Sequence, residues 1–361
     1  MVPNTAMDLP VISDDGRTYT IKVRAGIYFA NDRAFKGKQR ELTAYDYVYS
    51  IKRIFDPKVR SYWLYVFEGN LVGLDEVLAA ARKSGSFDYD AQIEGLQALD
   101  RFTLQIRFKQ PHYSFVWWLA TPALAAVARE VVDVYKDSSN RVMENPVGTG
   151  AYRLKHWTRG HHLVLEANTD YRNEQYPAPG SGSAPGDAAI AKGLKGRKLP
   201  LVGIVDISII DEDQSQMLTF DSGKLDYVTV PAPFAARVLA GSSLRPDYER
   251  RGIVLHRGVA PSVSYFFFNF EDPLLGGYSP ERIALRRAIS MGYNGDEAIR
   301  LLLDGQGITA MQPIPPPLYG HDPKYRAPTV TTPRQPTLYS IDFATKTRMA
   351  TVIAKCRMGS R

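Results

Sequence analysis

The sequence predicts an α/β fold built from more than one domain. The chain has 361 residues, a length at which two or three domains are expected. Segments with the two-residue alternation of a strand are interspersed with segments that have the periodicity of a helix. One succession of strand, helix and strand between Val202 and Val230 predicts a right-handed crossover between two strands of a shared sheet.

The N-terminal part opens with a predicted strand over Arg17–Arg24, where apolar and polar residues alternate in a β-branched run. A helix is predicted over Thr43–Phe55, with Thr43 as its N-cap and a stop at Asp56-Pro57. The same signals predict three further elements: a helix over 71–83, a strand over 102–108 and a helix over 123–135.

The central part contains a predicted hairpin with strands over Tyr152–Trp157 and His161–Glu166 and a turn at Arg159-Gly160. The three elements of the crossover are a buried strand over 202–210, a helix over 213–221 and a strand over 225–230. Later elements are strands over 253–257 and 263–270 and helices over 279–290 and 296–303, the first of these helices with proline in its first turn.

The charge distribution argues against a nucleic-acid partner. The net charge is +7, but residues 329–361 carry six Lys/Arg and one Asp, a net +5, so the first 328 residues carry only +2. No block of basic residues of the kind that binds nucleic acid is present. The one cysteine, Cys356, lies in the same basic tail. The rest of the chain therefore has no disulfide, cysteine-ligated zinc or catalytic thiol.

No residue pattern predicts a cofactor, a metal site or an enzyme. His161 and His162 are adjacent on a predicted strand, where neighbours point to opposite faces, so they are not placed to chelate one metal. No G-x-S-x-G nucleophile motif occurs. Gly148–Gly150 lacks the continuation of a phosphate loop. The acidic cluster Asp211–Asp213 precedes a helix, where it is expected to cap the helix.

Targeting signals are not recognised in the sequence. No stretch reaches the roughly 18 apolar residues of a membrane span. The first residues, Met1–Asp8, have neither a basic nor an apolar signal-peptide region. Expressed as written, the chain is therefore expected to stay in the cytoplasm.

Several segments in order resemble the extracytoplasmic solute-binding proteins of peptide, oligopeptide and nickel ABC importers. Asn145–Trp157 reads N-P-V-G-T-G-A-Y-R-L-K-H-W and is similar to the family's PVGTGPYRLKEW, with Ala151 in place of the usual proline. Leu42–Arg53 resembles the family helix LTAEDVVYSLKR, and Ala284–Asn294 resembles a later one. The resemblance implies a hinged, two-lobed periplasmic-binding-protein-like α/β fold with an extra domain, here incomplete at both ends.

The resemblance also implies a division of the chain. Residues 1–140 correspond to part of the extra α/β domain of the first lobe, 141–260 to the main part of that lobe, and 261–328 to the beginning of the second lobe. Residues 329–361 do not resemble the family and are expected to be disordered. Back-translated in a shifted frame, this tail yields a sequence similar to the family's continuation, so we hypothesise a frameshift. Sequencing the DNA around codon 328 tests this, because codons incompatible with the shifted reading would contradict it.

The candidate ligand-binding residues are Tyr265, Phe267 and Asn269. They alternate along the predicted strand 263–270 and would share one face, where an aromatic body, a hydroxyl and an amide suit a cleft wall that holds a peptide backbone. The even-numbered phenylalanines 266, 268 and 270 would face the core. The alternative is that both faces are core of a sandwiched sheet. Trp63 and the pair Trp117-Trp118 are weaker candidates for ligand binding and are expected in the core.

The resemblance implies a monomeric, periplasmic protein that binds a peptide or oligopeptide and delivers it to an ABC transporter permease in the membrane. Two alternatives remain open from the sequence. The chain could be a non-functional remnant of such a gene, unable to close on a ligand. It could also be a hydrolase, which the missing nucleophile and acid/base residues argue against.

Overall fold

The computed structural model describes residues 2–178, 185–316, 318–326, 343–346 and 351–353. The chain divides into two compact units, unit 1 over Met1–Ile209 and unit 2 over Ile210–Arg361. Their boundary falls inside the range 141–260 that the resemblance assigns to a single domain.

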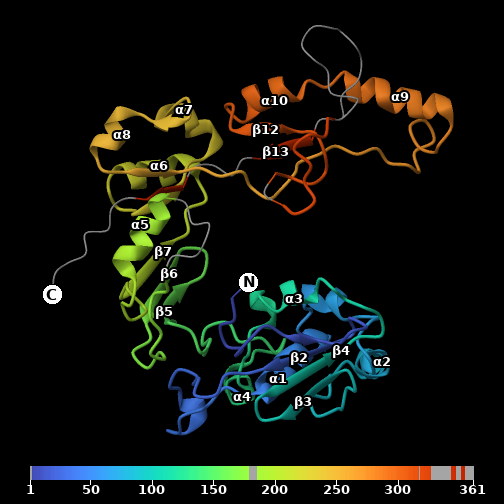
Figure 1. The fold of residues 1–361 in the computed structure, drawn as a ribbon, viewed down its shortest axis with the longest axis vertical. Helices are drawn as coiled ribbons and strands as arrows, with labels where there is room; N and C mark the ends of the chain where they lie inside the picture. The colour runs from blue at the N-terminus through green and yellow to red at the C-terminus, as the bar shows by residue number, and fades with distance from the viewer. Residues whose placement is uncertain (1, 179–184, 317, 327–342, 347–350, 354–361) are drawn as a thin grey trace. The chain divides into compact units, whose positions relative to one another are not determined.

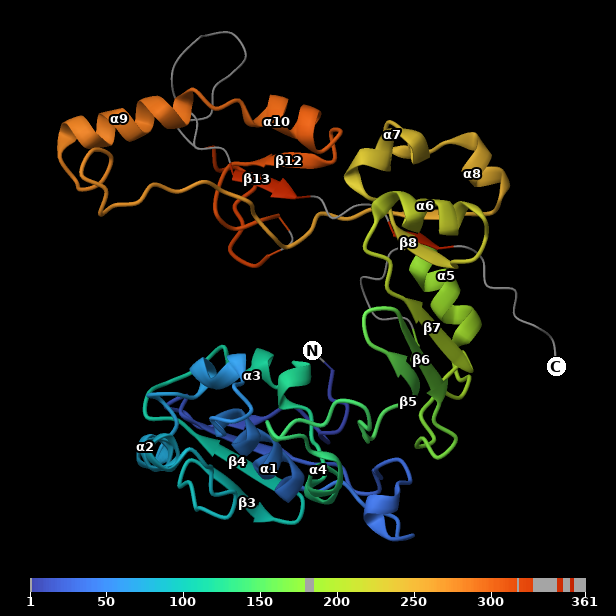
Figure 2. The same cartoon turned by 180° about the vertical axis from the view of Figure 1, so that it is seen from behind.

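The first sheet of unit 1 is antiparallel, with strand order β1-β2-β4-β3. Its strands are β1 (Val11–Ile12), β2 (Thr18–Lys22), β4 (Thr103–Arg107) and β3 (Leu96–Asp100). Helix α1 (Ala44–Phe55) contacts β3 and β4, as Figures 1 and 2 both show. Helix α2 (Leu74–Ser84) belongs to the same unit. The predicted strands 17–24 and 102–108 and the helices 43–55 and 71–83 are confirmed.

Helix α1 starts where its first turn is satisfied. Thr43 is the N-cap and forms a capping box with Asp46, whose carboxylate accepts hydrogen bonds from the Thr43 backbone N–H at 2.7 Å and from the Thr43 hydroxyl at 2.9 Å. Arg40 Nη2 also donates to Asp46 Oδ1 at 2.6 Å, and Arg40 Nε donates to Glu130 at 2.8 Å. Arg40 therefore bridges α1 and a later helix, α4 (Arg129–Tyr135).

The core of unit 1 lies between this sheet and its helices. Its centre is aromatic: the Phe108 ring is 4.8 Å from that of Phe115 and 6.2 Å from that of Tyr19, both in edge-to-face geometry. All three side chains are almost fully buried. The Tyr19 hydroxyl donates to the His112 carbonyl at 2.7 Å, so the buried phenol keeps a hydrogen-bond partner.

The predicted helix over 123–135 is wrong in its first half. A 3₁₀ turn, η3 (Pro122–Leu124), is followed by extended residues before α4 begins. The extended course has a tertiary cause, because the Ser50 hydroxyl of α1 accepts the Val127 N–H at 2.7 Å. Three short elements complete this part of the chain: η1 (Arg33–Phe35), η2 (Tyr62–Val66) and α3 (Phe115–Trp118).

The second sheet of unit 1 contains the predicted hairpin. Strands β5 (Tyr152–Thr158) and β6 (His162–Ala167) pair antiparallel, and β7 (Ile204–Ser208) pairs with the other edge of β6. Helix α5 spans Pro185–Leu194. The expectation that β7 is buried is wrong, because Ile204 is 55% exposed and Ile207 is 42% exposed.

Unit 2 begins with a small core around helix α6 (Asp213–Asp221) and strand β8 (Tyr227–Thr229). Because β8 and β7 belong to different sheets, the predicted crossover onto a shared sheet is wrong. Asp221 joins the helices, since its carboxylate accepts from Arg237 of α7 at 2.7 Å and from the Tyr248 hydroxyl of α8 at 2.9 Å. The remaining elements here are η4 (Ala232–Phe234), α7 (Ala235–Val238), β9 (Leu239–Ala240), β10 (Ser243–Leu244), α8 (Pro246–Arg250) and β11 (Val254–His256).

The later part of unit 2 consists of α9 (Pro280–Met291), α10 (Gly295–Leu302) and β12 (Gly307–Ala310). Both helices confirm the sequence prediction, and α10 lies against β12 (Figure 1). Strand β12 pairs with β13 (Phe343–Lys346), and β14 (Thr351–Ile353) pairs with β8 and β11. These two strands lie in the tail that was expected to be disordered; residues 327–342, 347–350 and 354–361 of the same region are outside the described part.

Candidate binding sites

The three residues predicted to contact a ligand lie on an irregular segment before α9. The predicted strand over 263–270 is wrong: Ser264 forms an isolated bridge, and residues 265–269 are not assigned to any strand in the described structure. Alternating side chains make a strand only when a neighbouring strand takes up the backbone hydrogen bonds. The reason for the error is therefore tertiary and is invisible in a local pattern.

The structure brings two of the three residues together. The rings of Tyr265 and Phe267 have centroids 6.5 Å apart, and the two side chains are 62% and 80% exposed. Asn269 is used differently, because its side-chain oxygen accepts the Glu271 N–H at 3.0 Å in a local turn. The ligand-binding role of these residues stays a prediction.

The even-numbered phenylalanines do not form the expected buried face. Phe266 is 75% exposed and Phe270 is 47% exposed. The Phe270 ring is covered on one side by the guanidinium of Arg286, whose carbon lies 4.5 Å from the ring centroid. In unit 1, Trp63 and Trp118 pack at the edge of the core as expected, but Trp117 is 65% exposed, so that part of the expectation is wrong.

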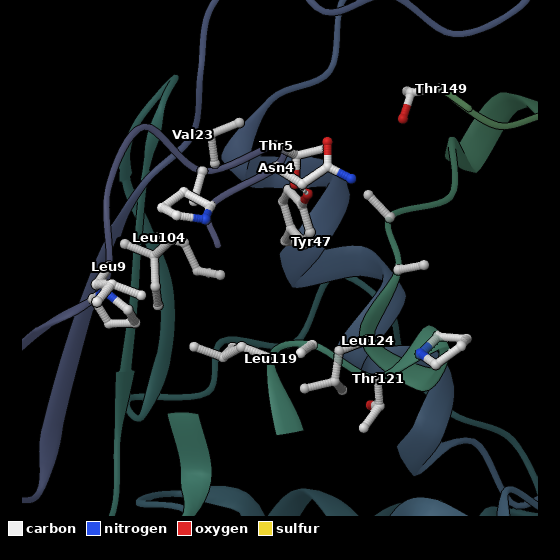
Figure 3. Close-up of a pocket in the computed structure, with 18 of the residues that line it drawn as sticks. Asn4, Thr5, Leu9, Val23, Tyr47, Leu104, Leu119, Thr121, Leu124 and Thr149 are labelled. Carbon is white, nitrogen blue, oxygen red and sulfur yellow. Dashed lines mark hydrogen bonds between the residues drawn. The ribbon is translucent and has the colours of Figure 1, made fainter. Parts of the chain in front are cut away.

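A cavity of about 650 Å³ lies in unit 1 (Figure 3). One wall is the N-terminal segment 2–10, which runs beside β2 through backbone hydrogen bonds from Met7 N to Lys22 O and from Arg24 N to Thr5 O, each 2.8 Å long. The opposite wall is the segment 119–126, which contains the 3₁₀ turn η3. Five buried side chains of the core line the cavity, namely Ile21, Val23, Ile51, Leu104 and Leu124.

Polar groups cluster at one side of this cavity. Figure 3 shows Asn4, Thr5 and Tyr47 close together, and the Thr5 hydroxyl lies 2.6 Å from the Tyr47 hydroxyl. Burial raises the pKa of Tyr47 above its ordinary value, so the phenol keeps its proton and can act as donor or acceptor. Thr149 adds another hydroxyl. An apolar interior with a few hydroxyls suits an uncharged or amide-bearing group with an apolar side chain.

Sequence reasoning missed this cavity for a physical reason. Tyr47 lies within the predicted helix 43–55, and residues 148–150 were considered only as a phosphate loop that lacks its continuation and as part of a family motif. The segment 2–10 has no strand or helix pattern. The cavity forms because these three stretches, distant in sequence, meet around the sheet.

The histidines do not form a metal site in the described residues, where no group of three His, Cys, Asp or Glu side chains is placed to hold an ion. His162 Nε2 lies 2.5 Å from Asp206 Oδ1 on the neighbouring strand β7. Within the same described ranges, no helix is long and apolar enough to cross a membrane.

Comparison with curated proteins finds peptide-transport components. The chain is 24% identical over 325 residues to the probable ABC transporter periplasmic-binding protein SapA of Escherichia coli, a match that covers 89% of this chain and 50% of SapA. It is 30% identical over 131 residues to the periplasmic oligopeptide-binding protein OppA of Salmonella typhimurium, covering 36% of this chain and 23% of OppA.

Solved structures give the same fold. The Helicobacter pylori periplasmic binding protein DppA, solved in complex with the peptide STSA, matches with a TM-score of 0.62 at 20% identity and covers 90% of this chain and 55% of that chain. Campylobacter jejuni NikZ, in complex with Ni(L-His), matches with a TM-score of 0.57 at 16% identity and covers 86% and 48%. These likenesses confirm the predicted α/β fold class of the periplasmic-binding-protein type.

The matches cover most of this chain but only part of each relative. The chain spans about half the length of its curated relative SapA and of the two solved structures above. The family model for bacterial extracellular solute-binding proteins, family 5, matches residues 1–346 and so continues past Pro328, where the resemblance by motifs ends. This family is one of solute-binding proteins rather than enzymes. Because the match covers almost the whole chain, the chain belongs to the bacterial extracellular solute-binding proteins of family 5.

Proposed function

We propose that the chain is the solute-recognising part of an ABC importer, which binds a peptide or oligopeptide and delivers it to a membrane permease. The observation that carries the proposal is the family match over residues 1–346. It is supported by relatives named for peptide and oligopeptide binding. SapA of Escherichia coli and SapA and OppA of Salmonella typhimurium are named as periplasmic, which supports a place of action outside the cytoplasmic membrane. We further propose that the protein acts as a monomer.

The cavity of unit 1 has the chemistry to hold part of a peptide. Its apolar floor would cover an uncharged side chain, and the hydroxyls of Thr5 and Tyr47 would hydrogen-bond backbone amides. The exposed pair Tyr265 and Phe267, with Asn269, is the second candidate surface. Aromatic rings of this kind contribute binding area without a large loss of side-chain entropy.

Titration with di- to pentapeptides tests the function. A peptide that binds only the folded protein raises its unfolding temperature. At a free peptide concentration a hundred times the dissociation constant, the free energy of unfolding rises by about 2.7 kcal/mol. Calorimetry then gives the affinity. If no peptide raises the unfolding temperature or gives heat, the proposal is wrong and the remnant alternative is favoured. Hydrolysis of any of these peptides would instead support the alternative that the chain is a hydrolase.

Variants separate the two candidate surfaces. Tyr47→Phe removes one cavity hydroxyl and should weaken peptide binding about fivefold if the cavity holds the backbone, since a hydrogen bond contributes about 1 kcal/mol. Tyr62→Phe, at a side chain 79% exposed outside the cavity, is the matched control. Weakening by Tyr265→Ala, Phe267→Ala or Asn269→Ala, with Tyr47→Phe silent, would place the ligand at the second surface.

A further inference from the structure

A second pocket of unit 1 is lined by two arginines. It has a volume of about 450 Å³ and is formed by two stretches of chain, residues 24–27 and 172–175. Its cations are Arg24 and Arg172, and its one acid is Glu174. We call this pocket, with residues 24–27 and 172–175 as its lining, the arginine pocket. None of these residues lines the cavity described above.

Both stretches are fixed in the folded chain by contacts outside the pocket. Gly26 takes a positive φ of 78°, and its N–H donates to the Glu41 carboxylate at 2.7 Å. Ile27 is 2% exposed and so anchors the turn in the core. On the other side, the Glu174 carbonyl accepts the Leu199 N–H at 2.8 Å. The pocket is therefore formed before any ligand arrives, which lowers the entropy cost of binding.

The guanidinium of Arg172 is oriented by its neighbours. Its carbon lies 4.8 Å from the centroid of the Tyr171 ring. Its Nη2 forms an ion pair with Glu174 at 2.6 Å and also donates to the Asn4 side-chain oxygen. Burial, together with a hydrogen bond to Glu174, raises the pKa of Tyr171 to about 12, so the phenol stays a donor at neutral pH. Glu174 is thus shared between two donors and does not use up the arginine.

Hydrogen-bond donors remain available on both arginines. Within the described residues, Arg172 Nε is buried without an acceptor, and its Nη1 forms no hydrogen bond. A buried donor without a partner is rare in folded proteins. The Arg24 side chain is exposed and forms no hydrogen bond or ion pair in the same part of the chain. The pocket therefore has two positive charges against one negative charge.

We propose that the arginine pocket binds a small oxyanion, a carboxylate or phosphate group, between Arg24 and Arg172. The planar guanidinium matches the geometry of both groups and supplies their counter-charge. The pocket is larger than either group alone, so it leaves room for the atoms that carry the anion. Because the pocket and the cavity share no residue, the inference does not depend on which solute the protein carries.

Calorimetric titration of the full chain with sodium phosphate tests the proposal. The titration is run at low ionic strength, with sodium chloride of matched ionic strength as the reference, because salt screens unspecific attraction. We expect saturable binding of phosphate and slower amide exchange at residues 24–27 and 172–175. Acetate in the same titration distinguishes the two kinds of ligand: tighter phosphate binding assigns a phosphate-bearing ligand, and tighter acetate binding a carboxylate-bearing one.

Three variants locate the binding. Arg24→Gln should weaken phosphate binding at least about tenfold, because a hydrogen bond to a charged group is lost. The Arg24 side chain is exposed and unpaired in the described residues, so this variant should keep the wild-type unfolding temperature. Arg172→Lys keeps the charge but loses the planar fork, and should also weaken binding. Arg60→Gln removes an exposed arginine outside the pocket and should bind phosphate like wild type.

The proposal is overturned if neither phosphate nor acetate binds saturably. It is equally overturned if Arg60→Gln weakens binding as much as Arg24→Gln, since the attraction would then come from the general positive charge. If Arg172→Lys does not fold, amide exchange of the wild-type chain with and without phosphate decides. Protection confined to residues outside both stretches would place the anion elsewhere and contradict the proposal.

Discussion

Phe108 and Phe267 are the same residue type with opposite surroundings. Phe108, in unit 1, is 1% exposed and is enclosed by Tyr19, Phe67 and Phe115. Phe267, in unit 2, is 80% exposed. Unit 1 has a continuous buried cluster that extends from Tyr19 to Val131, whereas the cluster of unit 2 ends at Ile253. Apolar content alone therefore does not make a core; the elements that cover it do.

The largest expected effect comes from emptying the core of unit 1. Phe108→Ala should destabilise unit 1 by about 3–5 kcal/mol, through lost burial and the cavity left behind. Phe267→Ala should change stability by no more than about 0.5 kcal/mol, because the ring is already in solvent. Urea unfolding followed by circular dichroism measures both. A loss of comparable size at Phe267 would contradict the contrast between the two units.

The next largest effect is expected at the start of α1. Asp46→Ala removes the capping box and leaves the half-buried Arg40 with Glu130 alone, so unit 1 should lose about 3 kcal/mol. The control is Glu68→Gln, which breaks an exposed ion pair with Arg82 and should cost at most about 0.5 kcal/mol. Equal midpoints for the two variants in denaturant would show that the Asp46 network adds nothing.

Unit 2 offers its own test through Asp221. Asp221→Ala removes the acceptor shared by Arg237 and the Tyr248 hydroxyl, and should destabilise unit 2 by about 2 kcal/mol. Unit 1 contains none of these groups, so its amide exchange should not change. Hydrogen exchange resolved by peptide distinguishes the two units. Faster exchange in β2 and β4 of this variant would mean that the units do not unfold separately.

The smallest effect is a pH dependence in unit 1. Burial, together with a hydrogen bond of 2.7 Å to Asp56, raises the pKa of Tyr89 in the folded chain. The unfolded pKa is about 10, so this stabilisation is complete below pH 10 and is lost as the pH rises further. Tyr89→Phe should cost about 1 kcal/mol at pH 7 and make the loss above pH 10 shallower. Unchanged steepness in alkaline unfolding curves would assign the dependence to other groups.

Local signals were enough to predict much of unit 1. Thr43 with Asp46 marks the start of α1, and the alternation around Tyr19 marks β2; both depend on residues a few positions apart. The hairpin of β5 and β6 is likewise encoded by its own turn. These elements are stabilised by the tertiary contacts that their sequences anticipate.

The candidate site could not be predicted from local sequence signals. The Thr5–Tyr47 contact joins residues 42 positions apart, and the extended course at Val127 depends on a hydroxyl from α1. The aromatic run 265–270 failed in the opposite way, since its residues have high strand propensity but strand pairing depends on a neighbour that no local window contains. Local sequence patterns predict single helices and strands, whereas a cavity or a sheet depends on contacts between elements that are distant in sequence.

The two ion pairs of the Arg40 guanidinium, with Asp46 and with Glu130, predict how these positions vary among relatives. One cation serves two acids that belong to different helices and lie far apart in sequence. Replacement of Arg40 by a neutral residue would leave two carboxylates without their counter-charge. Among relatives, positions 40, 46 and 130 should therefore covary as a triplet, with any loss of the arginine accompanied by loss of an acid.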